Sequence, residues 1–156
     1  MNVWYVNSIL GTFRLEEEND AICGLTLCPD GVPELEPLPR KVCETPLLQE
    51  AEEQLNEYFA GARREFDLPL APKGTPFQKA VWAEMCRIPY GETRTYGQLA
   101  AAVGKPKASR AVGGACHCNP IAILQPCHRV VGSTGRLTGY AYGVEMKQYL
   151  LELEQQ

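Results

Sequence analysis

The stretch "TYGQLAAAVGKPKASRAVGGAC" (95–116) contains two short helical patterns separated by a basic turn that includes a glycine. Thr95 and Gln98 have the spacing of a capping box, in which each side chain satisfies a free backbone amide at the start of a helix. The turn is "GKPKA" (104–108), and a second helix begins at "SRAVGG" (109–114). Two helices joined in this way are typical of a helix-turn-helix, although ordinary helix packing produces the same pattern.

The residues before this pair predict another helix. Thr75, Pro76 and Gln78 form a second capping box, with proline at the first helical position. The buried stripe expected for this helix consists of Phe77, Val81, Trp82 and Met85. The short helix after Thr95 should turn three apolar residues inward, namely Leu99, Ala100 and Val103.

Downstream, "IAILQPCHRVVGSTG" (121–135) places a cysteine beside a histidine. The apolar run Ile121 to Leu124 predicts a short buried strand, and Pro126 then favours a turn or a first helical turn. On a strand, Cys127 and His128 would point to opposite faces. On a turn they need not, and a water molecule could relay a proton from the sulfur to the imidazole.

Two interpretations of this pair remain open. An isolated Cys-His dipeptide is usually a structural thiol with an incidental histidine. It could also be a nucleophile and its activator, because the thiolate is the reactive form of cysteine and His128 could take its proton. A helix N-terminus and Arg129 could stabilise the negative sulfur. Glu154, at the flank of the buried face of a helix over 144–154, could orient the histidine.

The cysteines predict free thiols rather than disulfides or a metal site. Seven cysteines are an odd number, and their spacing forms no disulfide framework. The tripeptide "CHC" (116–118) lacks the second ligand pair of a usual zinc site. We therefore expect no bound metal.

The first half predicts a small αβ domain. "WYVNSILGTFRLEEENDAICGLTL" (4–27) has short apolar runs around a glycine turn, consistent with a strand pair. Prolines make 29–46 an irregular connection, apolar spacing predicts a helix over 46–60, and "FDLPLAPKG" (66–74) resembles a linker. The predicted fold class is α+β: a small αβ N-terminal domain (1–70) and a mainly helical C-terminal domain with a helix-turn-helix (71–156).

Charge is distributed unevenly along the 156 residues, whose net charge is −4. Residues 1–71 hold five Lys/Arg and 14 Asp/Glu, a net −9, whereas residues 72–156 hold ten and five, a net +5. The basic half could meet a polyanion, although an ordinary acidic surface on the other half is the simpler alternative. No window is long and apolar enough for a membrane span, and the N-terminus does not read as a signal peptide. We expect a soluble protein of the cytoplasm, or of the nucleus if the source is a eukaryote.

Several segments together resemble the O6-alkylguanine-DNA alkyltransferase family. They are "PCHRVV" (126–131), "SRAVGGACHCNPI" (109–121), "GRLTGYAYG" (135–143), "GTPFQKAVW" (74–82), "IPYGETRTYGQLA" (88–100) and "KQYLLELE" (147–154). The resemblance is continuous over residues 74–154, and the combination is highly specific. The residues before it match only loosely.

The resemblance implies a single-turnover DNA-repair methyltransferase that needs no cofactor. Such a protein binds the minor groove of double-stranded alkylated DNA as a monomer, through its helix-turn-helix. It flips the damaged guanine out of the duplex, because a stacked base cannot reach a buried thiol. The alkyl group then passes irreversibly from O6 of guanine to Cys127, and the reaction could extend to O4 of thymine.

The resemblance also implies roles for single residues. Cys127 is the alkyl acceptor, His128 the water-mediated base and Glu154 the acid that orients it. Asn119 braces the cysteine loop, while Tyr96 assists flipping and can protonate N3 of the leaving guanine. The implied substrate contacts are the Val130 carbonyl, the Tyr140 ring as a pocket wall, and Lys147. The implied DNA contacts are Arg110 as a finger that enters the base stack, together with Tyr96, Ser109, Thr75 and Gln98.

Some of these roles have plainer alternatives. Tyr140 could be a packed turn aromatic, Lys147 a solvated helix residue, and Arg110 a phosphate contact that positions without specifying. The sequence also departs from the family pattern. Gln125 stands where a β-branched apolar residue is more usual, and Cys116 and Cys118 add thiols near the site. Cys23 and Cys28 without a histidine in the first half argue against the structural zinc of some relatives.

Two other functions compete with alkyl transfer. The first is a non-enzymatic alkyl-lesion binding protein, but such relatives have another residue in place of Cys127. The second is a Cys-His hydrolase or a thiol redox enzyme, which would need an oxyanion site or a resolving cysteine and would leave "SRAVGG" and "TYGQLA" unexplained.

Overall fold

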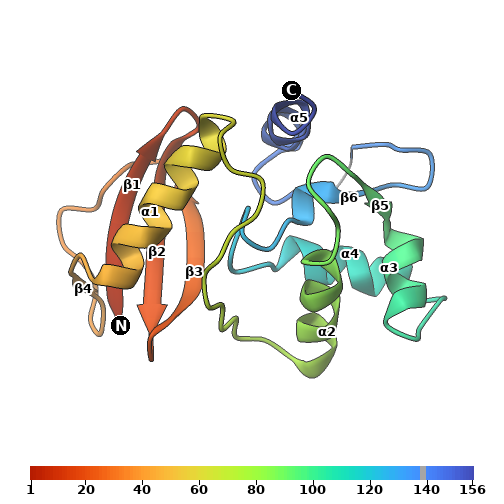
Figure 1. Ribbon diagram of the computed structural model, residues 1–156. Coiled ribbons are helices and arrows are strands. Elements are labelled where there is room, and N and C mark those ends of the chain that lie inside the picture. Colours follow the sequence, from red (N-terminus) through yellow and green to blue (C-terminus); the bar gives the residue numbers. More distant parts are fainter. Residues whose placement is uncertain (138–139) are drawn as a thin grey trace. The chain divides into compact units, whose positions relative to one another are not determined.

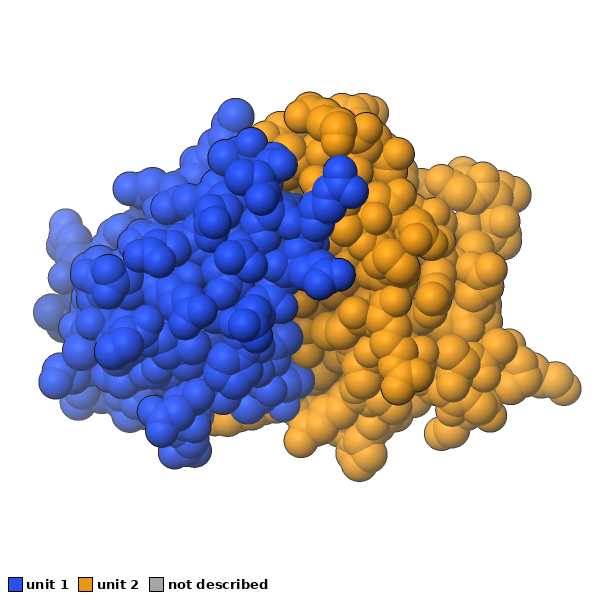
Figure 2. Space-filling view, in the orientation of Figure 1, with its two compact units in different colours: residues 1–72 blue, residues 73–156 orange. Residues whose placement is uncertain are grey.

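The computed structural model describes residues 1–137 and 140–156 of the chain. The chain forms two compact units, Met1–Pro72 (unit 1) and Lys73–Gln156 (unit 2), which have different colours in Figure 2. Unit 1 contains the larger sheet, and unit 2 is mainly helical (Figure 1). The predicted α+β class is therefore confirmed.

Unit 1 is built on a four-stranded sheet in the order β3-β2-β1-β4. An antiparallel meander is formed by β1 (Asn2–Ser8), β2 (Gly11–Glu18) and β3 (Ala21–Cys28), and the short β4 (Lys41–Val42) runs parallel to β1. The prediction of a strand pair is therefore incomplete, because the sheet has four strands. Sequence reasoning missed the turn Asn19–Asp20, where both residues have positive φ, as a two-residue hairpin turn requires and as Asn and Asp tolerate.

One helix, α1 (Pro46–Phe59), covers one face of this sheet (Figure 1). Its position confirms the helix predicted over 46–60. Alternation along β2 buries Phe13 and Leu15 and also the carboxylate of Glu17. That carboxylate accepts hydrogen bonds from Asn2 Nδ2 at 3.1 Å and from Thr45 Oγ1 at 3.0 Å. Because Thr45 is the N-cap of α1, the buried acid ties the start of the helix to the sheet.

Part of the segment predicted to be a linker (66–74) pairs with the outer strand β3 of the sheet. Leu70 forms a parallel bridge with Ile22. The Ile22 amide donates to Pro69 O, and the Ala71 amide donates to Ile22 O, both at 2.8 Å. The linker prediction is thus wrong for residues 69–71. Proline lacks a donor but can accept, so a proline-containing segment can pair along an outer strand such as β3.

The helices of unit 2 pack around an apolar core. They are α2 (Pro76–Met85), α3 (Tyr96–Ala102), α4 (Ser109–His117) and α5 (Val144–Leu153), and α5 packs on a single 3-10 turn, η1 (Cys127–Arg129). The two-residue strands β5 (Arg94–Thr95) and β6 (Val130–Val131) pair in parallel. None of the helices within residues 1–137 and 140–156 has the length and apolar character needed to cross a membrane.

Both predicted capping boxes are present, at Thr75–Gln78 for α2 and at Thr95–Gln98 for α3. The Trp82 indole N–H donates to Ala115 O at 2.8 Å, which ties α2 to α4. Two residues expected to face inward are only half-buried, namely Phe77 and Val103. Each lies near a helix end, where the apolar stripe reaches the edge of the core.

The turn between α3 and α4 closes the first helix with a Schellman motif. Gly104 has φ +78°, its amide donates to Ala101 O at 3.0 Å, and the Lys105 amide donates to Ala100 O at 2.9 Å. A residue with a Cβ would be strained at this φ, so glycine is required here. The order of helix, basic turn and helix agrees with the sequence pattern, while its assignment as a helix-turn-helix stays a prediction.

The apolar run Ile121 to Leu124 does not form the predicted strand. The Gln125 amide donates to Ile121 O at 3.0 Å and the Leu124 amide donates to Ala122 O at 2.7 Å, so the run folds into a tight turn. All four of its residues are buried. A short apolar run indicates burial, but it does not distinguish a strand from a buried turn.

Replacing Thr45 with alanine should lower the free energy of unfolding of unit 1 by about 1–2 kcal/mol. The change removes the cap on the Leu48 amide (3.1 Å) and one of the donors to the buried Glu17 carboxylate. Urea unfolding followed by far-ultraviolet circular dichroism measures the effect. Glu44→Ala, at the exposed neighbouring position, is the control and should change the value by less than about 0.5 kcal/mol. Equal effects of the two substitutions would contradict this role of the cap.

Candidate active site

Cys127 is the first residue of the turn η1 in unit 2. Pro126 precedes it at the N-cap position, and the Arg129 amide donates to Pro126 O at 3.0 Å, so the proline starts a helical turn as predicted. The Cys127 thiol is buried and lies 3.3 Å from Asn119 Nδ2, which donates a hydrogen bond to the sulfur. The neighbouring residue on the turn, His128, is fully buried.

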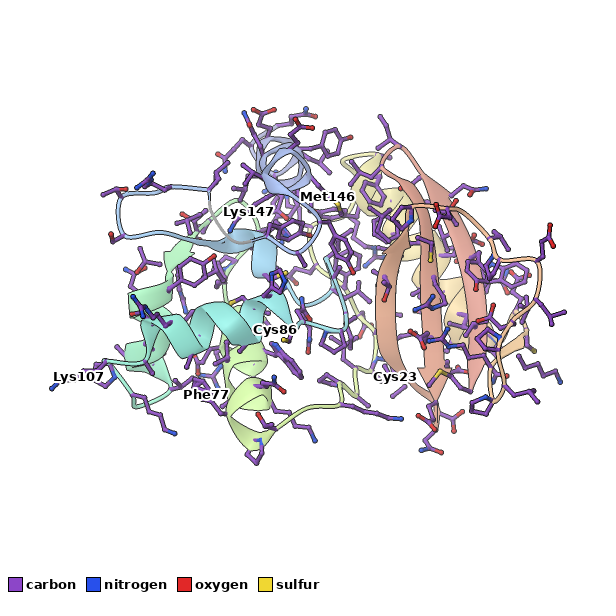
Figure 3. All side chains as sticks on the ribbon, turned by 180° about the vertical axis from the view of Figure 1, so that it is seen from behind. Cys23, Phe77, Cys86, Lys107, Met146 and Lys147 are labelled. Atoms are coloured by element: carbon purple, nitrogen blue, oxygen red, sulfur yellow. The ribbon has the colours of Figure 1, made fainter. Side chains whose placement is uncertain are left out.

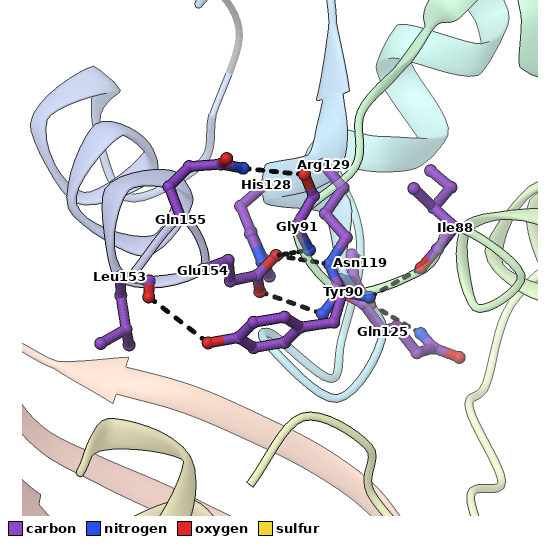
Figure 4. A network of polar contacts seen from close by, with 10 residues as sticks. All are labelled: Ile88, Tyr90, Gly91, Asn119, Gln125, His128, Arg129, Leu153, Glu154 and Gln155. Atoms are coloured by element: carbon purple, nitrogen blue, oxygen red, sulfur yellow. Dashed lines mark hydrogen bonds and ion pairs between the residues drawn. The ribbon is translucent and has the colours of Figure 1, made fainter. Parts of the chain in front are cut away.

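The loop before Cys127 is held by one amide and contains a strained residue. Asn119 Nδ2 also donates to Gln125 O at 2.8 Å (Figure 4). Asn119 Oδ1 accepts from the Ile121 amide at 3.1 Å. Between these two anchors, Ile123 has φ +68°, which is unusual for a β-branched residue. Such strain persists only where the surrounding contacts enforce it, and it is concentrated at functional sites.

The His128 ring has one occupied nitrogen and one open nitrogen. Nε2 lies 2.7 Å from Glu154 Oε2 (Figure 4). Because a carboxylate accepts hydrogen bonds, this contact places the ring proton on Nε2 and leaves a lone pair on Nδ1. Nδ1 is buried and has no hydrogen-bond partner among the described residues. The geometry therefore offers Nδ1 as a general base.

Glu154 is held by more than the histidine. Arg129 forms a two-pronged contact with its carboxylate, with Nε to Oε1 at 2.8 Å and Nη2 to Oε2 at 3.0 Å. Arg129 Nη1 donates to Ile88 O at 2.7 Å. The expectation that Arg129 stabilises the sulfur is therefore wrong, because its guanidinium is committed to Glu154 and Ile88. Paired, forked contacts of this kind fix orientation as well as charge.

Gly91 completes the surroundings of the Glu154 carboxylate. The Gly91 amide donates to Glu154 Oε1 at 3.3 Å, and Gly91 O accepts from Gln155 Nε2 at 2.8 Å (Figure 4). Its φ is +81°, and a Cβ at this position would lie 3.2 Å from Glu154 O. Both facts require glycine. Sequence reasoning missed Gly91 as part of the site, and the only available signal was a glycine in the turn "IPYGE".

The cation near the sulfur is Lys147 of α5. Its side chain is buried and extends from α5 toward the interior of unit 2 (Figure 3). Burial lowers the pKa of Lys147, and the neighbouring Cys127 and Cys116 partly offset this by favouring the charged amine. Burial raises the pKa of Cys127, whereas the Asn119 hydrogen bond and the Lys147 charge lower it. The solvated-lysine alternative is thus wrong, and two groups in the site favour the thiolate.

Burial also determines the charge state of the histidine. It lowers the pKa of His128, and although Glu154 acts in the opposite direction, the positive charges of Arg129 and Lys147 add to the lowering. His128 is therefore neutral near neutral pH and able to accept a proton. Arg129 contributes by neutralising the Glu154 carboxylate, which would otherwise favour an imidazolium.

Three further predicted residues lie around this centre. Tyr140 is buried, and its hydroxyl has no hydrogen-bond partner among the described residues. Burial, followed by the charge of a Cys127 thiolate, raises the pKa of Tyr140. Tyr96 begins α3, with its ring 5.7 Å from Lys147 Nζ. Val130 is buried in β6, directly after η1.

The remaining predicted residues lie on the surface of unit 2 and not in this buried cluster. Ser109 and Arg110 are exposed in the first turn of α4, and Thr75 and Gln98 are exposed in the two capping boxes. The predicted site residues therefore fall into two groups, a buried cluster around Cys127 and an exposed set of polar side chains.

The seven cysteines are free thiols. Within residues 1–137 and 140–156, no group of three or more His, Cys, Asp or Glu side chains is arranged to hold a metal ion. Cys116, on α4, is buried like Cys127. Burial raises the pKa of Cys116 to about 12.

Two family models match the chain. The DNA binding domain of 6-O-methylguanine DNA methyltransferase matches residues 76–156, and the ribonuclease-like domain of the same enzyme matches residues 3–72. The chain belongs to this family. The motif "GRLTGYAYG" of this family includes Thr138 and Gly139, which lie outside the described residues.

Similar proteins of archaea and bacteria are named methylated-DNA–protein-cysteine methyltransferases. A methylated-DNA–protein-cysteine methyltransferase of Methanosarcina barkeri is 60% identical over 107 residues, which are 69% of this chain and 68% of that protein. The constitutive methylated-DNA–protein-cysteine methyltransferase of Bacillus subtilis is 49% identical over 148 residues, which are 93% of this chain and 90% of that protein. A crystal structure of Mycobacterium tuberculosis OGT in complex with DNA has a TM-score of 0.89 and 41% identity, covering 99% of this chain and 93% of that one.

The lowered pKa of His128 predicts a specific pH dependence of stability. The unfolded chain, with a histidine pKa of about 6.5, binds this proton more readily than the folded protein. The stabilisation is therefore complete above about pH 6.5 and is lost as the pH falls toward the lower folded pKa, by up to about 1.4 kcal/mol per pH unit. Urea unfolding at a series of pH values measures this slope.

Two variants assign the slope to His128. His128→Gln keeps a side-chain N–H for Glu154 but cannot titrate, so the unfolding free energy should depend less steeply on pH below about 6.5. His117→Gln, at an exposed position, is the matched control. An unchanged slope in His128→Gln would show that another group causes the acid sensitivity.

Proposed function

We propose that this protein repairs DNA by moving an alkyl group from O6 of guanine to the sulfur of Cys127, once per molecule. Its relatives are named methylated-DNA–protein-cysteine methyltransferases, and the chain has the cysteine that this name requires. The observation that carries the assignment is the open Nδ1 of His128, opposite the nitrogen bound to Glu154. A buried thiol beside a neutral base is arranged to become a nucleophile.

The reaction begins with loss of the thiol proton. His128 Nδ1 accepts it through a water molecule, while Glu154 stabilises the imidazolium that forms, and Asn119 and Lys147 stabilise the thiolate. The sulfur then attacks the alkyl carbon, and the carbon–O6 bond breaks. Its electron pair passes to the guanine, which takes up a proton. The donor of that proton regains one from the His128 imidazolium, so the proton lost by the thiol balances the proton that the guanine gains.

The leaving guanine needs a pocket and a proton donor. We assign the donor to the Tyr96 phenol, the pocket wall to the Tyr140 ring and the acceptor for the guanine amine to the Val130 carbonyl. The buried hydroxyl of Tyr140 has no hydrogen-bond partner among the described residues, and it supports a ligand in this pocket because buried polar groups without partners are rare. The same pocket could admit O4-alkylthymine, a smaller base. The product is a thioether, which no group in the site can cleave, so the protein is used once.

The protein binds DNA. The similar Mycobacterium tuberculosis OGT has been crystallised in complex with DNA. The +5 charge of residues 72–156 suits a polyanion. Figure 3 shows Lys107, in the turn between α3 and α4, extending away from the body of unit 2. We assign α3 and α4 to a helix-turn-helix on the minor groove of double-stranded DNA, with Arg110 as the finger in the stack and Ser109, Thr75 and Gln98 as surrounding contacts. We assign the protein as a monomer. It acts in the cytoplasm, or in the nucleus if the source is a eukaryote.

The competing functions fit the site less well. A lesion-binding protein without transfer has no use for a thiol held between Asn119 and Lys147 beside an open histidine nitrogen. A Cys-His hydrolase needs oxyanion donors, and the Asn119 amide, its nearest candidate, is already bound to the sulfur and to Gln125 O. Alkyl transfer uses each of these groups.

Incubation with an equimolar duplex that contains O6-methylguanine should add the mass of one methyl group to Cys127. Intact-protein and peptide mass spectrometry measure the product. A second equivalent of duplex should remain unrepaired, because the thioether cannot be regenerated. Cys127→Ala should bind the lesion and transfer nothing, and Cys118→Ala, at an exposed thiol, is the matched control that should react like the parent. Several turnovers per protein molecule would exclude this mechanism.

His128→Gln should slow methyl transfer by about 10²–10⁴-fold, the usual contribution of a general base. Glu154→Gln should slow it less, because this residue orients the imidazole and stabilises its charge without receiving the proton. Binding of the lesion duplex should change little in either variant once circular dichroism shows it to be folded, since loss of the Glu154 charge also leaves Arg129 without its buried partner. Stopped-flow or quench assays of transfer, set beside binding titrations, test both expectations. Transfer at the parent rate in both variants would refute the proton path.

Arg110→Ala should slow repair of a duplex much more than reaction with free O6-benzylguanine. An intercalating side chain offsets lost base stacking only where a stack exists. Lys107→Ala is the control: it removes a basic side chain of the same surface and should only lower the dependence of log affinity on log salt, by about 0.9 if it contacts one phosphate. Equal loss on both substrates in Arg110→Ala would assign the residue to pocket integrity. No loss on either would make it irrelevant to repair.

A further inference from the structure

Gln125 lies in the strained loop before Pro126, at the position where the sequence departs from its family pattern. Its side chain is buried, with a relative exposure of 3%. A buried amide is costly unless it is hydrogen-bonded. The Gln125 Nε2 atom donates to Asn119 Oδ1 at 2.7 Å (Figure 4).

The Asn119 amide must face one way for the chemistry to work. Its Nδ2 can donate to the sulfur and favour the thiolate, whereas its Oδ1 in the same place would repel a thiolate. Two backbone groups set this orientation: the Ile121 amide, which can only donate, meets Oδ1 at 3.1 Å, and Gln125 O, which can only accept, meets Nδ2 at 2.8 Å. The Gln125 side chain adds a second and shorter donor to Oδ1.

We infer that Gln125 is a positioning residue for the nucleophile, which holds and polarises the Asn119 amide so that Nδ2 donates to Cys127 Sγ. The two residues form a closed pair, because Asn119 donates to the Gln125 carbonyl and the Gln125 side chain donates back to Asn119 Oδ1. A donor on Oδ1 draws electron density from the amide and makes its N–H the stronger donor. The inference rests on the proposed function only in taking Cys127 as the nucleophile.

The other charged and titratable groups around the sulfur do not depend on Gln125. They are Lys147 from α5, Cys116 from α4, Tyr140, and His128 on η1 itself. Removing the Gln125 amide leaves all four in place. A change in the acidity of Cys127 on substitution of Gln125 therefore reports the path through Asn119.

The test compares two substitutions of Gln125 with a control. Gln125→Met keeps the length of the side chain and removes its donor, and we expect the pKa of Cys127 to rise by about 0.5–1 unit, which lowers the thiolate fraction about 3- to 10-fold. Gln125→Glu places an acceptor and a negative charge against Asn119 Oδ1 and should raise the pKa further, through the reversed amide and through direct repulsion of the thiolate, so the path through Asn119 is assigned from Gln125→Met alone. Leu124→Met, at the adjacent buried position of the same loop, should leave the pKa unchanged.

The readout is the ultraviolet absorbance of the thiolate against pH, taken as the difference between each protein and the same protein with Cys127→Ser. The rate of reaction with O6-benzylguanine against pH is measured in parallel and should move by the same amount. Circular dichroism establishes that each variant is folded. Because the absorbance readout needs no alkyl donor, a shift in pKa without any alkyl transfer by the parent would support the positioning role while refuting the proposed function.

A double-substitution cycle separates positioning from simple filling of space. Asn119→Ser removes the donor to the sulfur, and in that background Gln125→Met should cause no further rise in the pKa of Cys127. A folded Gln125→Met protein with the parent pKa and rate would overturn the inference. An equal shift with and without Asn119 would also overturn it, because the effect would then not pass through that amide.

Discussion

The buried carboxylate of Glu154 is the group on which the arrangement of the site depends. It receives Arg129 in a forked contact, His128 at 2.7 Å and the Gly91 amide at 3.3 Å. These contacts join the end of α5 to η1 and to the loop between α2 and α3. Removing one partner of such a buried ion pair usually costs about 3–5 kcal/mol, because the other charge is left without compensation. The orientation of His128 and the docking of the last helix are therefore a single constraint.

The dry environment that this network creates has opposite effects on the two reacting groups. Burial raises the pKa of Cys127 and lowers that of His128, so both are neutral at rest and the thiol holds its proton. The same low dielectric makes each polar contact stronger than it would be in water. A single N–H from Asn119 and the charge of Lys147 are then significant for the thiolate. At rest the site therefore holds the sulfur as a thiol beside a neutral histidine.

Much of the fold was predictable because its signals are local. The capping boxes at Thr75 and Thr95 and the apolar spacing of α1 each lie within a few residues, so short-range geometry determines them. The strand predicted at Ile121 to Leu124 failed for a different reason. Its apolar character reports burial, while the turn it adopts is held by the Asn119 side chain, which binds the Ile121 amide two residues on and Gln125 O, a local turn signal that the apolar pattern masked. The third strand of unit 1 was missed because Asn19 and Asp20 were not recognised as a hairpin turn.

The sequence by itself predicted Cys127 and His128 as the reacting groups, and it determined where the helices of unit 2 begin and that Pro126 starts a turn at Cys127. These follow from side-chain chemistry and from backbone rules that act over neighbouring residues. Only the tertiary structure decided which basic side chain pairs with the Glu154 carboxylate and which one stabilises the Cys127 thiolate. Arg129 follows His128 in sequence yet binds Glu154, while Lys147, distant in sequence, lowers the pKa of the Cys127 thiol. The reason is that η1 directs successive side chains to different sides, and the packing of α5 on that turn sets which charge each one meets.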